Sequence, residues 1–386
     1  MAFAGDGRFE MCPGERAWAD RTRLASSIMT DPTDRPGISD LKPGSLEWSK
    51  LVCLAASYFF QADPFRPERA EIAKLIDKPV RPGFDPWNAT DFTKFLRAKG
   101  FRPTDATLLS RLLAKMERAG LLVECGWDSS LSVMGQYYIS VGAAHYLMQG
   151  DLWLSEVLGF EVIIESYNLV TVRISRSGRR GSGTGVVLDH SHLVTNRHVI
   201  DGLTGREVDI IHTDLSFKRV GADLITHQCC VHGHQELDVA VIEANIEDTQ
   251  GFPRLPDMLF REPNWVDEVY VFGYPYVPGT IDEPITVQPG RVVSPTTIAA
   301  AAGGYPQHKA FLFSAIARPG NSGGPIVAQD GRVIGLVEEH GQEGLSGTGG
   351  DSNSEAPVFY RGIPASEVVR AIEELKFTGL AWLDQG

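Results

Sequence analysis

The spacing of apolar residues changes near residue 159 and divides the chain into two parts. Before this point apolar residues recur every three or four positions, as on one face of a helix; after it they form short runs bounded by Gly, Pro, Asp and Asn. The runs that predict strands are Val162–Ile174, Gly185–Leu188, Leu193–Asn196, Asp209–His212, Val239–Glu243, Val269–Phe272 and Val333–Val337. Many short strands, with a helix only at Pro364–Leu375, predict a β-sandwich or barrel. We therefore expect a multidomain chain in which a mainly α domain precedes an all-β domain.

The first part is predicted to be a small helical domain that ends in a hairpin. Its strongest helix covers residues 107–119, because Leu109, Leu112 and Met116 lie on one face and Gly120 follows. Shorter helices are predicted from Leu46, at 67–76, at 91–98 and at about 142–158, and strands at 121–124 and 134–141. We place this domain at residues 45–158, after a loosely ordered arm of residues 1–44 that is rich in Pro, Gly, Asp and Arg.

Charge is distributed unevenly between the two parts. The 386 residues carry 36 Lys+Arg and 49 Asp+Glu, a net charge of -13. Residues 1–150 contain 19 basic and 18 acidic residues, which leaves 17 and 31 for the remainder. The acidic second part is therefore unsuited to coating nucleic acid, whereas the nearly neutral first part does not exclude it.

The chain begins without a pattern for export or membrane insertion. Asp6, Arg8 and Glu10 interrupt the apolar core that a secretory signal needs, and the most apolar early run, Leu51–Phe60, is about half the length that crosses a bilayer. The five cysteines are odd in number and thinly spread, unlike a disulfide framework. We expect a cytoplasmic protein that does not interact with membranes.

Three segments of the second part each contain one member of a nucleophilic triad. They are LVTNRHVI with His198, ELDVAVI with Asp238 and PGNSGGPIV with Ser322. A serine hydroxyl is a weak nucleophile near neutral pH, so it needs an imidazole to take its proton and a carboxylate to orient that imidazole. The backbone N–H groups of Gly320 and Ser322 can bind the oxyanion if the loop turns tightly.

These segments resemble the trypsin-like serine peptidases of the chymotrypsin fold, most closely the HtrA (DegP-like) branch. SGTGVVL, LVTNRHVI, ELDVAVI, VFGYP, ITVQPGRVVS and PGNSGGPIV occur in that family's order between Ile163 and Ala371. The resemblance implies a double β-barrel protease domain at residues 159–386, catalysis by His198, Asp238 and Ser322, and no cofactor. Because only about 25 residues follow Phe359–Gly362, no PDZ domain is expected after the protease.

The same resemblance assigns a primary specificity pocket and a regulatory loop. The pocket is assigned to Ala315, Ile316, Ala317, Val337, Glu338 and Glu339. Its apolar base favours small or medium aliphatic substrate side chains; the two glutamates could attract a basic one, but alternation along a strand directs only one of them inward. The Ala- and Gly-rich segment 294–309 is predicted to be a mobile loop that gates activity, with a simple surface loop as the alternative.

The helices and hairpin of the first part resemble a winged helix-turn-helix domain over residues 46–149. The resemblance depends on the order of these elements and on the segment ERAGLLVE before the hairpin. In a DNA-binding version, the helix at 107–118 would enter the major groove. The nearly neutral charge favours a module for protein contacts instead, so we expect a protein partner, with DNA as the alternative.

A dense group of His and Cys residues precedes Asp238. In HQCCVHGHQ the candidate ligands are His227, Cys229, Cys230, His232 and His234. Zinc could be structural or inhibitory here, but the spacing matches no standard zinc pattern, and a strand followed by an exposed turn accounts for the segment without metal. No metal site is therefore predicted.

These features together predict an intracellular bacterial serine endopeptidase that is regulated and narrow in specificity. Its protein substrate is expected among the products of neighbouring genes. Two alternatives stay open: a DNA-binding regulator whose protease domain cleaves itself or a partner, and a scaffold with an inactive protease fold.

Overall fold

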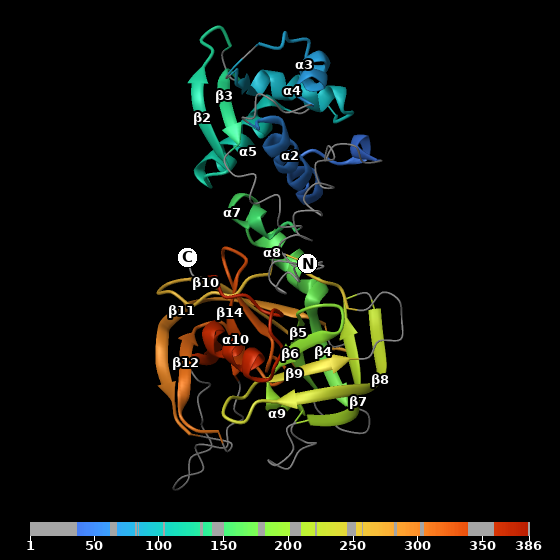
Figure 1. The fold of residues 1–386 in the computed structure, drawn as a ribbon, viewed down its shortest axis with the longest axis vertical. Helices are drawn as coiled ribbons and strands as arrows, with labels where there is room; N and C mark the ends of the chain where they lie inside the picture. Colours follow the sequence, from blue (N-terminus) through green and yellow to red (C-terminus); the bar gives the residue numbers. More distant parts are fainter. Residues whose placement is uncertain are drawn as a thin grey trace, which may run out of the picture. The chain divides into compact units, whose positions relative to one another are not determined.

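The structure, a computed structural model, divides into two compact units, Met1–Gln149 and Gly150–Gly386 (Figure 1). The described residues are 37–61, 68–81, 83, 85–102, 105–131, 134–140, 150–176, 182–200, 210–220, 222–244, 252–256, 258–281, 284–301, 305–338 and 359–384. Residues 150–158, which the sequence pattern places in the first domain, belong to the second unit. Of the predicted arm, residues 1–36 lie outside the described ranges, and the rest contains the 3-10 helix η1 (Ile38–Asp40).

The first unit combines helices with a three-stranded antiparallel sheet. Its further elements are, in chain order, α2 (Leu46–Phe59), α3 (Arg69–Leu75), β1 (Trp87–Asn88), α4 (Ala89–Ala98), α5 (Ala106–Arg118), β2 (Leu122–Trp127) and β3 (Gln136–Ser140). The strand order is β1-β3-β2, so the hairpin β2–β3 is extended by one short strand that precedes α4. The helices predicted at 67–76, 91–98 and 107–119 and the predicted hairpin are confirmed to within a few residues.

The ends of α5 show why the sequence forms a helix there. At its start the Asp105 carboxylate accepts a hydrogen bond from the Thr107 N–H (2.9 Å). At its end the N–H groups of Gly120 and Leu121 donate to the carbonyls of Glu117 and Met116, each at 2.9 Å. This cap requires a positive φ, here 72° at Gly120, which glycine adopts without steric cost.

Aromatic side chains form the core of the first unit. Phe59, Phe92 and Phe95 are fully buried, and the Phe59 ring centroid lies 5.3 and 5.1 Å from those of the other two. Trp87 packs on the same ring at 4.8 Å. Rings of this size bury a large apolar area, so this cluster holds α2, α4 and β1 together.

The second unit contains two closed barrels, which confirms the predicted double-barrel fold. The first has the order β4-β5-β6-β9-β8-β7 and the second β10-β11-β12-β15-β14-β13. The strands of the first are β4 (Thr171–Arg176), β5 (Ser182–Val187), β6 (His192–Thr195), β7 (Ile210–Arg219), β8 (Ala222–Gly233) and β9 (Ala240–Ala244). Those of the second are β10 (Glu268–Gly273), β11 (Thr286–Ala299), β12 (His308–Phe313), β13 (Pro325–Ala328), β14 (Val333–Glu338) and β15 (Tyr360–Pro364).

The segment before the first barrel is helical, contrary to the strand predicted at Val162–Ile174. The 3-10 helix η2 (Leu152–Leu154) and α7 (Ser155–Leu158) lead into α8 (Phe160–Val170), and only Thr171 onward is extended. Val162, Ile163, Tyr167 and Val170 are buried, at the spacing of one helix face, and the Tyr167 hydroxyl donates to the Gly331 carbonyl (2.8 Å). An unbroken apolar run satisfies helical and strand spacing alike, and packing selects the helix here.

The predicted mobile loop at 294–309 is also revised. Residues 294–299 continue β11 and pair with β12, with Ile298 opposite Lys309 and Ala299 opposite His308. The hairpin is therefore longer than expected, and only residues 300–307 connect its strands. The β-branched residues Thr296, Thr297 and Ile298 favour this extended conformation.

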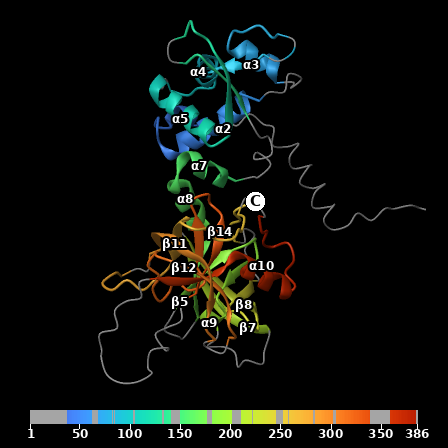
Figure 2. The ribbon, with the colours of Figure 1, turned by 90° about the vertical axis from the view of Figure 1, so that its left-hand side faces the viewer.

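The predicted C-terminal helix is confirmed as α10 (Ala365–Glu374), which lies against the barrels in both ribbon views (Figures 1 and 2). Its buried Val368, Val369 and Ile372 join the core of this unit. Within the described ranges, no helix combines the length and the apolar character that spanning a bilayer requires.

Candidate active site

The first barrel brings His198 and Asp238 together. His198 lies in the short helix α9 (Arg197–Ile200) directly after β6, and Asp238 lies in the turn between β8 and β9. The His198 Nδ1 is 2.6 Å from Asp238 Oδ2, and the His198 backbone N–H donates to Oδ1 at 2.9 Å. The Asp238 side chain is fully buried while that of His198 is 35% exposed. A carboxylate fixed in this way holds the ring with its Nδ1 proton inward and turns Nε2 outward.

Asn196 ties the segment that carries His198 to the segment that carries Asp238. Its side-chain Nδ2 donates to the Asp238 carbonyl at 2.8 Å. The strands on either side, β6 and β9, are paired, with Thr195 opposite Ala240. The sequence reasoning did not single out Asn196, although its place in TNRH, two residues before His198, is the available signal.

The second barrel supplies Ser322 on a tight turn. The Asn321 N–H donates to the Arg318 carbonyl (2.9 Å), which closes a turn with Pro319 and Gly320 at its centre. Gly320 has φ of 103°, and a Cβ there would collide with the Tyr274 carbonyl oxygen. Proline followed by glycine is the pair that such a turn requires. The tight turn expected from the sequence thus has a direct steric reason at Gly320.

Hydrogen bonds fix the orientation of both predicted oxyanion-hole peptides. The Pro319 carbonyl accepts from the Tyr276 N–H (3.3 Å), and the Asn321 carbonyl accepts from the Gly324 N–H (2.8 Å). Because a trans peptide is planar, the N–H groups of Gly320 and Ser322 point away from those carbonyls. Neither N–H donates to any other residue in the part of the chain that the structure describes, so both can serve an incoming oxyanion.

Thr184 of the first barrel holds this turn of the second. Its N–H donates to the Ser322 carbonyl (2.9 Å), and its hydroxyl donates to the Gly320 carbonyl (2.6 Å) and accepts from the Tyr274 N–H (3.0 Å). The sequence reasoning missed this residue. The signal was a polar side chain between two glycines in SGTGVVL, where a strand would otherwise carry an apolar one.

Gly323 brings the Ser322 turn against the segment that carries His198. A Cβ at Gly323 would collide with the Thr195 hydroxyl and approach the Asn196 nitrogen to 2.7 Å. The turn is therefore in backbone contact with the end of β6, and only glycine allows this approach. Ser322 itself is buried, at 6% exposed.

The residues assigned to the specificity pocket occupy several environments. Ala315, Ala317 and Val337 are buried in the core of the second barrel, and the Ile316 side chain is 45% exposed. The Glu338 side chain is fully buried, with His308 Nε2 at 2.9 Å and Arg361 Nε at 3.5 Å, and it thus belongs to an internal charged cluster. Glu339 lies outside the described residues. The pocket assignment remains a prediction.

Glu338 shifts the pKa of His308. Its hydrogen bond to the imidazole raises the pKa of His308, an effect that burial partly opposes. Both ring nitrogens are engaged, because Nδ1 lies 3.1 Å from the Pro306 carbonyl. The His308 side chain is only 5% exposed. It stabilises the buried Glu338 carboxylate and does not face a ligand.

The candidate ligands in HQCCVHGHQ do not gather as one set. Cys229 faces the barrel core, and His234 bonds to Glu374 of α10 (2.7 Å). The side chain of His227 lies outside the described residues. Cys230 and His232 remain on the outer surface, where Glu243 of β9 joins them.

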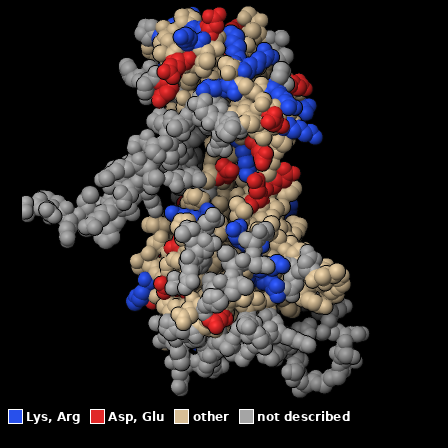
Figure 3. Space-filling view, turned by 90° about the vertical axis from the view of Figure 1, so that its right-hand side faces the viewer, with Lys and Arg blue, Asp and Glu red and all other residues tan. Residues whose placement is uncertain are grey.

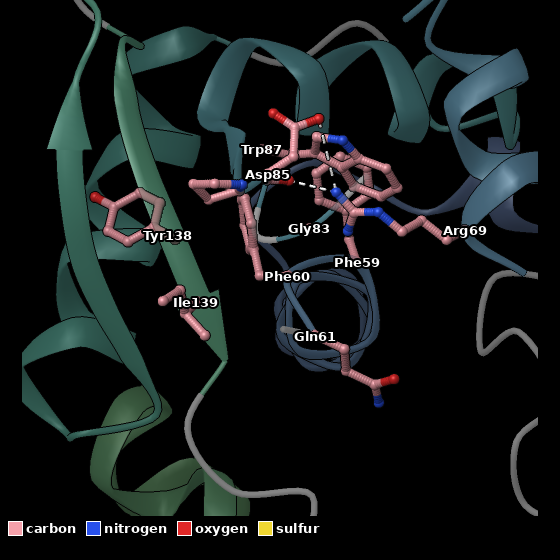
Figure 4. A pocket seen from close by; sticks show the side chains of 10 residues that line it. Phe59, Phe60, Gln61, Arg69, Gly83, Asp85, Trp87, Tyr138 and Ile139 are labelled. Atoms are coloured by element: carbon pink, nitrogen blue, oxygen red, sulfur yellow. Dashed lines mark hydrogen bonds and ion pairs between the residues drawn. The ribbon is translucent and has the colours of Figure 1, made fainter. Parts of the chain in front are cut away.

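A pocket of the first unit is occupied by an internal ion pair (Figure 4). The Arg69 guanidinium stacks 4.5 Å over the Trp87 ring, lies 3.8 Å from the Asp85 carboxylate and also donates to the Asp85 carbonyl. The Arg69 side chain is only 9% exposed. Its charge is compensated within the fold, so this hollow is not an open anion site.

Comparison with known proteins identifies the barrels. Residues 183–336 match the family described as "Trypsin-like peptidase domain". The second unit contains a trypsin-like peptidase domain. This domain is similar to the Serine protease Do-like HtrA of Bacillus subtilis strain 168, at 25% identity over 222 residues, 54% of this chain and 44% of that protein. It is also similar to the chloroplastic Protease Do-like 1 of Arabidopsis thaliana, at 31% identity over 161 residues, 41% of this chain and 33% of that protein.

The trypsin-like peptidase domain also has solved structural neighbours. They include the inactive and active forms of the Rv3671c protease, the latter from M. tuberculosis. Both have a TM-score of 0.40 and 19% identity; they cover 55% and 57% of this chain and 92% and 88% of those chains. This chain spans less than half the length of the curated relatives it matches.

Proposed function

We propose that the protein is a serine endopeptidase whose catalytic residues come from both barrels. The observation that carries this proposal is the pairing of His198 with the buried Asp238, beside a Ser322 turn that Thr184 ties to the same barrel. The buried Asp238 carboxylate is suited to orienting the imidazole. The accessible His198 imidazole is suited to proton transfer.

In the proposed reaction, the Ser322 hydroxyl attacks the carbonyl carbon of the scissile peptide bond. His198 Nε2 takes the hydroxyl proton, and the Asp238 carboxylate stabilises the imidazolium that forms. The carbonyl oxygen becomes an oxyanion, which the N–H groups of Gly320 and Ser322 bind. His198 then returns the proton to the leaving amine, and water releases the acyl group from Ser322 by the same steps in reverse.

A fluorophosphonate probe tests this proposal without knowledge of the substrate. We expect the full-length protein to be labelled once per chain, and Ser322→Ala to remain unlabelled. Ser39→Ala, which removes an exposed serine of the first unit, is the matched control and should label like the wild type. Equal labelling of the wild type and Ser322→Ala, or none of either, would refute the proposal and favour an inactive scaffold.

The finer features of this proposal are regulation, narrow specificity and a cytoplasmic location. A protease in a reducing cell interior must spare most proteins, which requires either a selective pocket or a recruiting module. We propose that the first unit recruits the substrate or a sensor, and a neighbouring gene is the first place to seek that protein.

We propose further that the first unit is a winged-helix module that binds protein through its hairpin. The order of its elements, with the hairpin after α5 and a single strand before α4, supports the winged-helix assignment. The hairpin, residues 122–140, contains Glu124 and Asp128 but no Lys or Arg. Its Val123 and Trp127 are about half exposed, at 47% and 48%. Such a hairpin is a poor ligand for phosphate and a suitable one for an apolar protein surface.

Nucleic acid is the competing ligand, and α5 is the element that would read it. Arg111, Lys115 and Arg118 are exposed on this helix, and basic side chains lie among acidic ones on the face of the first unit seen in Figure 3. Fluorescence anisotropy with duplex DNA over a salt series decides between a protein ligand and a nucleic-acid ligand of the first unit. We expect no salt-sensitive binding by the full-length protein. Binding that weakens steeply with salt and is lost in the double variant Arg111→Ala/Lys115→Ala would establish the DNA-binding alternative.

A further inference from the structure

Three potential metal ligands meet on the outer face of the first barrel. They are Cys230 and His232 on β8 and Glu243 on β9, and one ligand atom from each lies within 4.8 Å of the others. Cys230 and Glu243 are directly opposite each other in the strand pairing. The three differ in chemistry, with one sulfur, one nitrogen and one oxygen donor.

Strand alternation explains why these side chains share a face. On β8 the buried Cys229 and Val231 point into the barrel, so Cys230 and His232 point outward. On β9 the buried Ile242 and Ala244 leave Glu243 outward. The arrangement therefore follows from the core packing of the barrel and not from a flexible loop.

The His232 ring is held in place for this role. It packs edge-on against Phe377, which follows α10, with ring centroids 4.8 Å apart. Its Nε2 lies 3.7 Å from a carboxylate oxygen of Glu243. The Glu243 side chain is 52% exposed, so an ion can approach from its side, whereas the His232 Nε2 atom is itself shielded from solvent. A positioned imidazole beside a carboxylate lowers the conformational cost of binding a metal.

We propose that Cys230, His232 and Glu243 form a zinc site outside the active site. Thiolate, imidazole and carboxylate are the donors that zinc combines in proteins, whereas magnesium and calcium prefer oxygen alone. On binding, the Cys230 thiol releases its proton to solvent and the sulfur bonds to zinc. Three protein ligands leave the fourth tetrahedral position to water.

The site has a structural consequence for the catalytic domain. Residues 234–239, which include Asp238, form the turn between β8 and β9. Glu243, opposite Cys230, is three residues after Ala240, the first residue of β9. At the rise of a β-strand, this places the pair roughly 10 Å from the turn. Zinc would cross-link the two strands of this hairpin and resist their separation. The ion is thus expected to stabilise the folded domain without taking part in peptide hydrolysis.

Cobalt and zinc titrations of the chelator-stripped full-length protein test the proposal. We expect cobalt to produce a thiolate-to-metal charge-transfer band, which one equivalent of zinc abolishes. Cys230→Ser should lose the band, and His232→Ala and Glu243→Gln should each weaken zinc binding by about tenfold or more. The control Cys125→Ser, which removes an exposed cysteine of the first unit, should bind like the wild type.

Circular dichroism of each variant confirms that it is folded. A wild-type protein that gives no charge-transfer band with cobalt would overturn the proposal. So would a band that persists in folded Cys230→Ser, because the sulfur ligand would then lie elsewhere. Since zinc binding is read by absorbance, failure of this proposal is independent of whether the protein is a peptidase.

Discussion

Each barrel of the second unit contains a buried carboxylate bonded to a histidine, but only one of these histidines reaches solvent. In the first barrel Asp238 is 2.6 Å from His198, whose side chain is 35% exposed; in the second Glu338 is 2.9 Å from His308, which is 5% exposed. The two pairs have nearly the same chemistry. Exposure of the imidazole therefore distinguishes a pair that can transfer protons to a substrate from one that stabilises the fold.

The barrels also differ in how they contribute to the proposed reaction. The first contributes side chains, His198 and Asp238, held by Asn196. The second contributes backbone geometry, a turn in which Gly320 has a conformation that other residues rarely adopt. Substitutions in the first barrel should therefore alter proton transfer, and those in the second should alter oxyanion binding.

Asp238→Asn should have the largest effect. The amide retains the shape of the side chain but cannot stabilise the imidazolium and favours the wrong ring tautomer, so we expect the rate to fall by about 10⁴-fold. The second-order rate constant of fluorophosphonate labelling measures this change. The matched substitution Glu338→Gln in the second barrel should leave the rate of the folded protein within a few-fold of the wild type.

Gly320→Ala should reduce the rate next most strongly. The added methyl group would collide with the Tyr274 carbonyl oxygen, so the turn must move and the Gly320 N–H with it. Loss of one oxyanion-hole donor costs about 10²- to 10³-fold in rate. Labelling kinetics measure the effect, and Gly279→Ala is a control, because that glycine also has a positive φ but has no atom within 4 Å of an added Cβ. Similar rates for both variants would contradict the assignment of the oxyanion hole.

His308→Gln should affect stability rather than rate. Removing one partner leaves the Glu338 charge buried and less well compensated, which costs about 3 kcal/mol. Urea unfolding followed by tryptophan fluorescence measures the loss in free energy. Labelling by the folded fraction should be unchanged, and a rate loss like that of Asp238→Asn would remove the distinction between the two pairs.

Thr184→Val should lower the rate of fluorophosphonate labelling by about tenfold. The variant keeps the side-chain shape but removes the hydrogen bonds to the Gly320 carbonyl and the Tyr274 N–H, and each such loss costs about 1 kcal/mol. Thr184→Ser retains the hydroxyl and should restore most of the rate. If valine and serine were equivalent, Thr184 would not position the turn.

The stabilisation from His308 should depend on pH in a defined direction. Its pKa is raised in the folded state, so this contribution is complete below the unfolded-state pKa, about 6.5, and is lost as pH rises through the folded-state value. Urea unfolding at several pH values should show this small loss in the wild type. In His308→Gln that part of the pH dependence should be absent.

The sequence allowed the double-barrel fold to be predicted and the candidate site residues to be proposed for specific physical reasons. His198, Asp238 and Ser322 lie in short contiguous segments whose residue types match one chemistry, and the strands alternate or carry β-branched residues. Segment 162–170 was mispredicted because an unbroken apolar run suits either helix or strand, and only packing selects α8.

Contacts between distant segments could not be predicted. His308 and Glu338 are 30 residues apart and meet only because the second barrel closes. Glu243 could not be assigned to the Cys230 and His232 group, since the strand register that places it opposite Cys230 is not visible in the sequence. Thr184 likewise acts through contacts with a turn more than 130 residues away.

In the proposed mechanism, one histidine from the first barrel activates one serine from the second. The most direct measurement is the rate of fluorophosphonate reaction in His198→Ala, with the modified residue mapped by tandem mass spectrometry. We predict that the wild type is modified at Ser322 and that His198→Ala reacts at the same serine about 10⁴-fold more slowly. Modification of Ser322 at the wild-type rate in His198→Ala, or of another residue in the wild type, would contradict this mechanism.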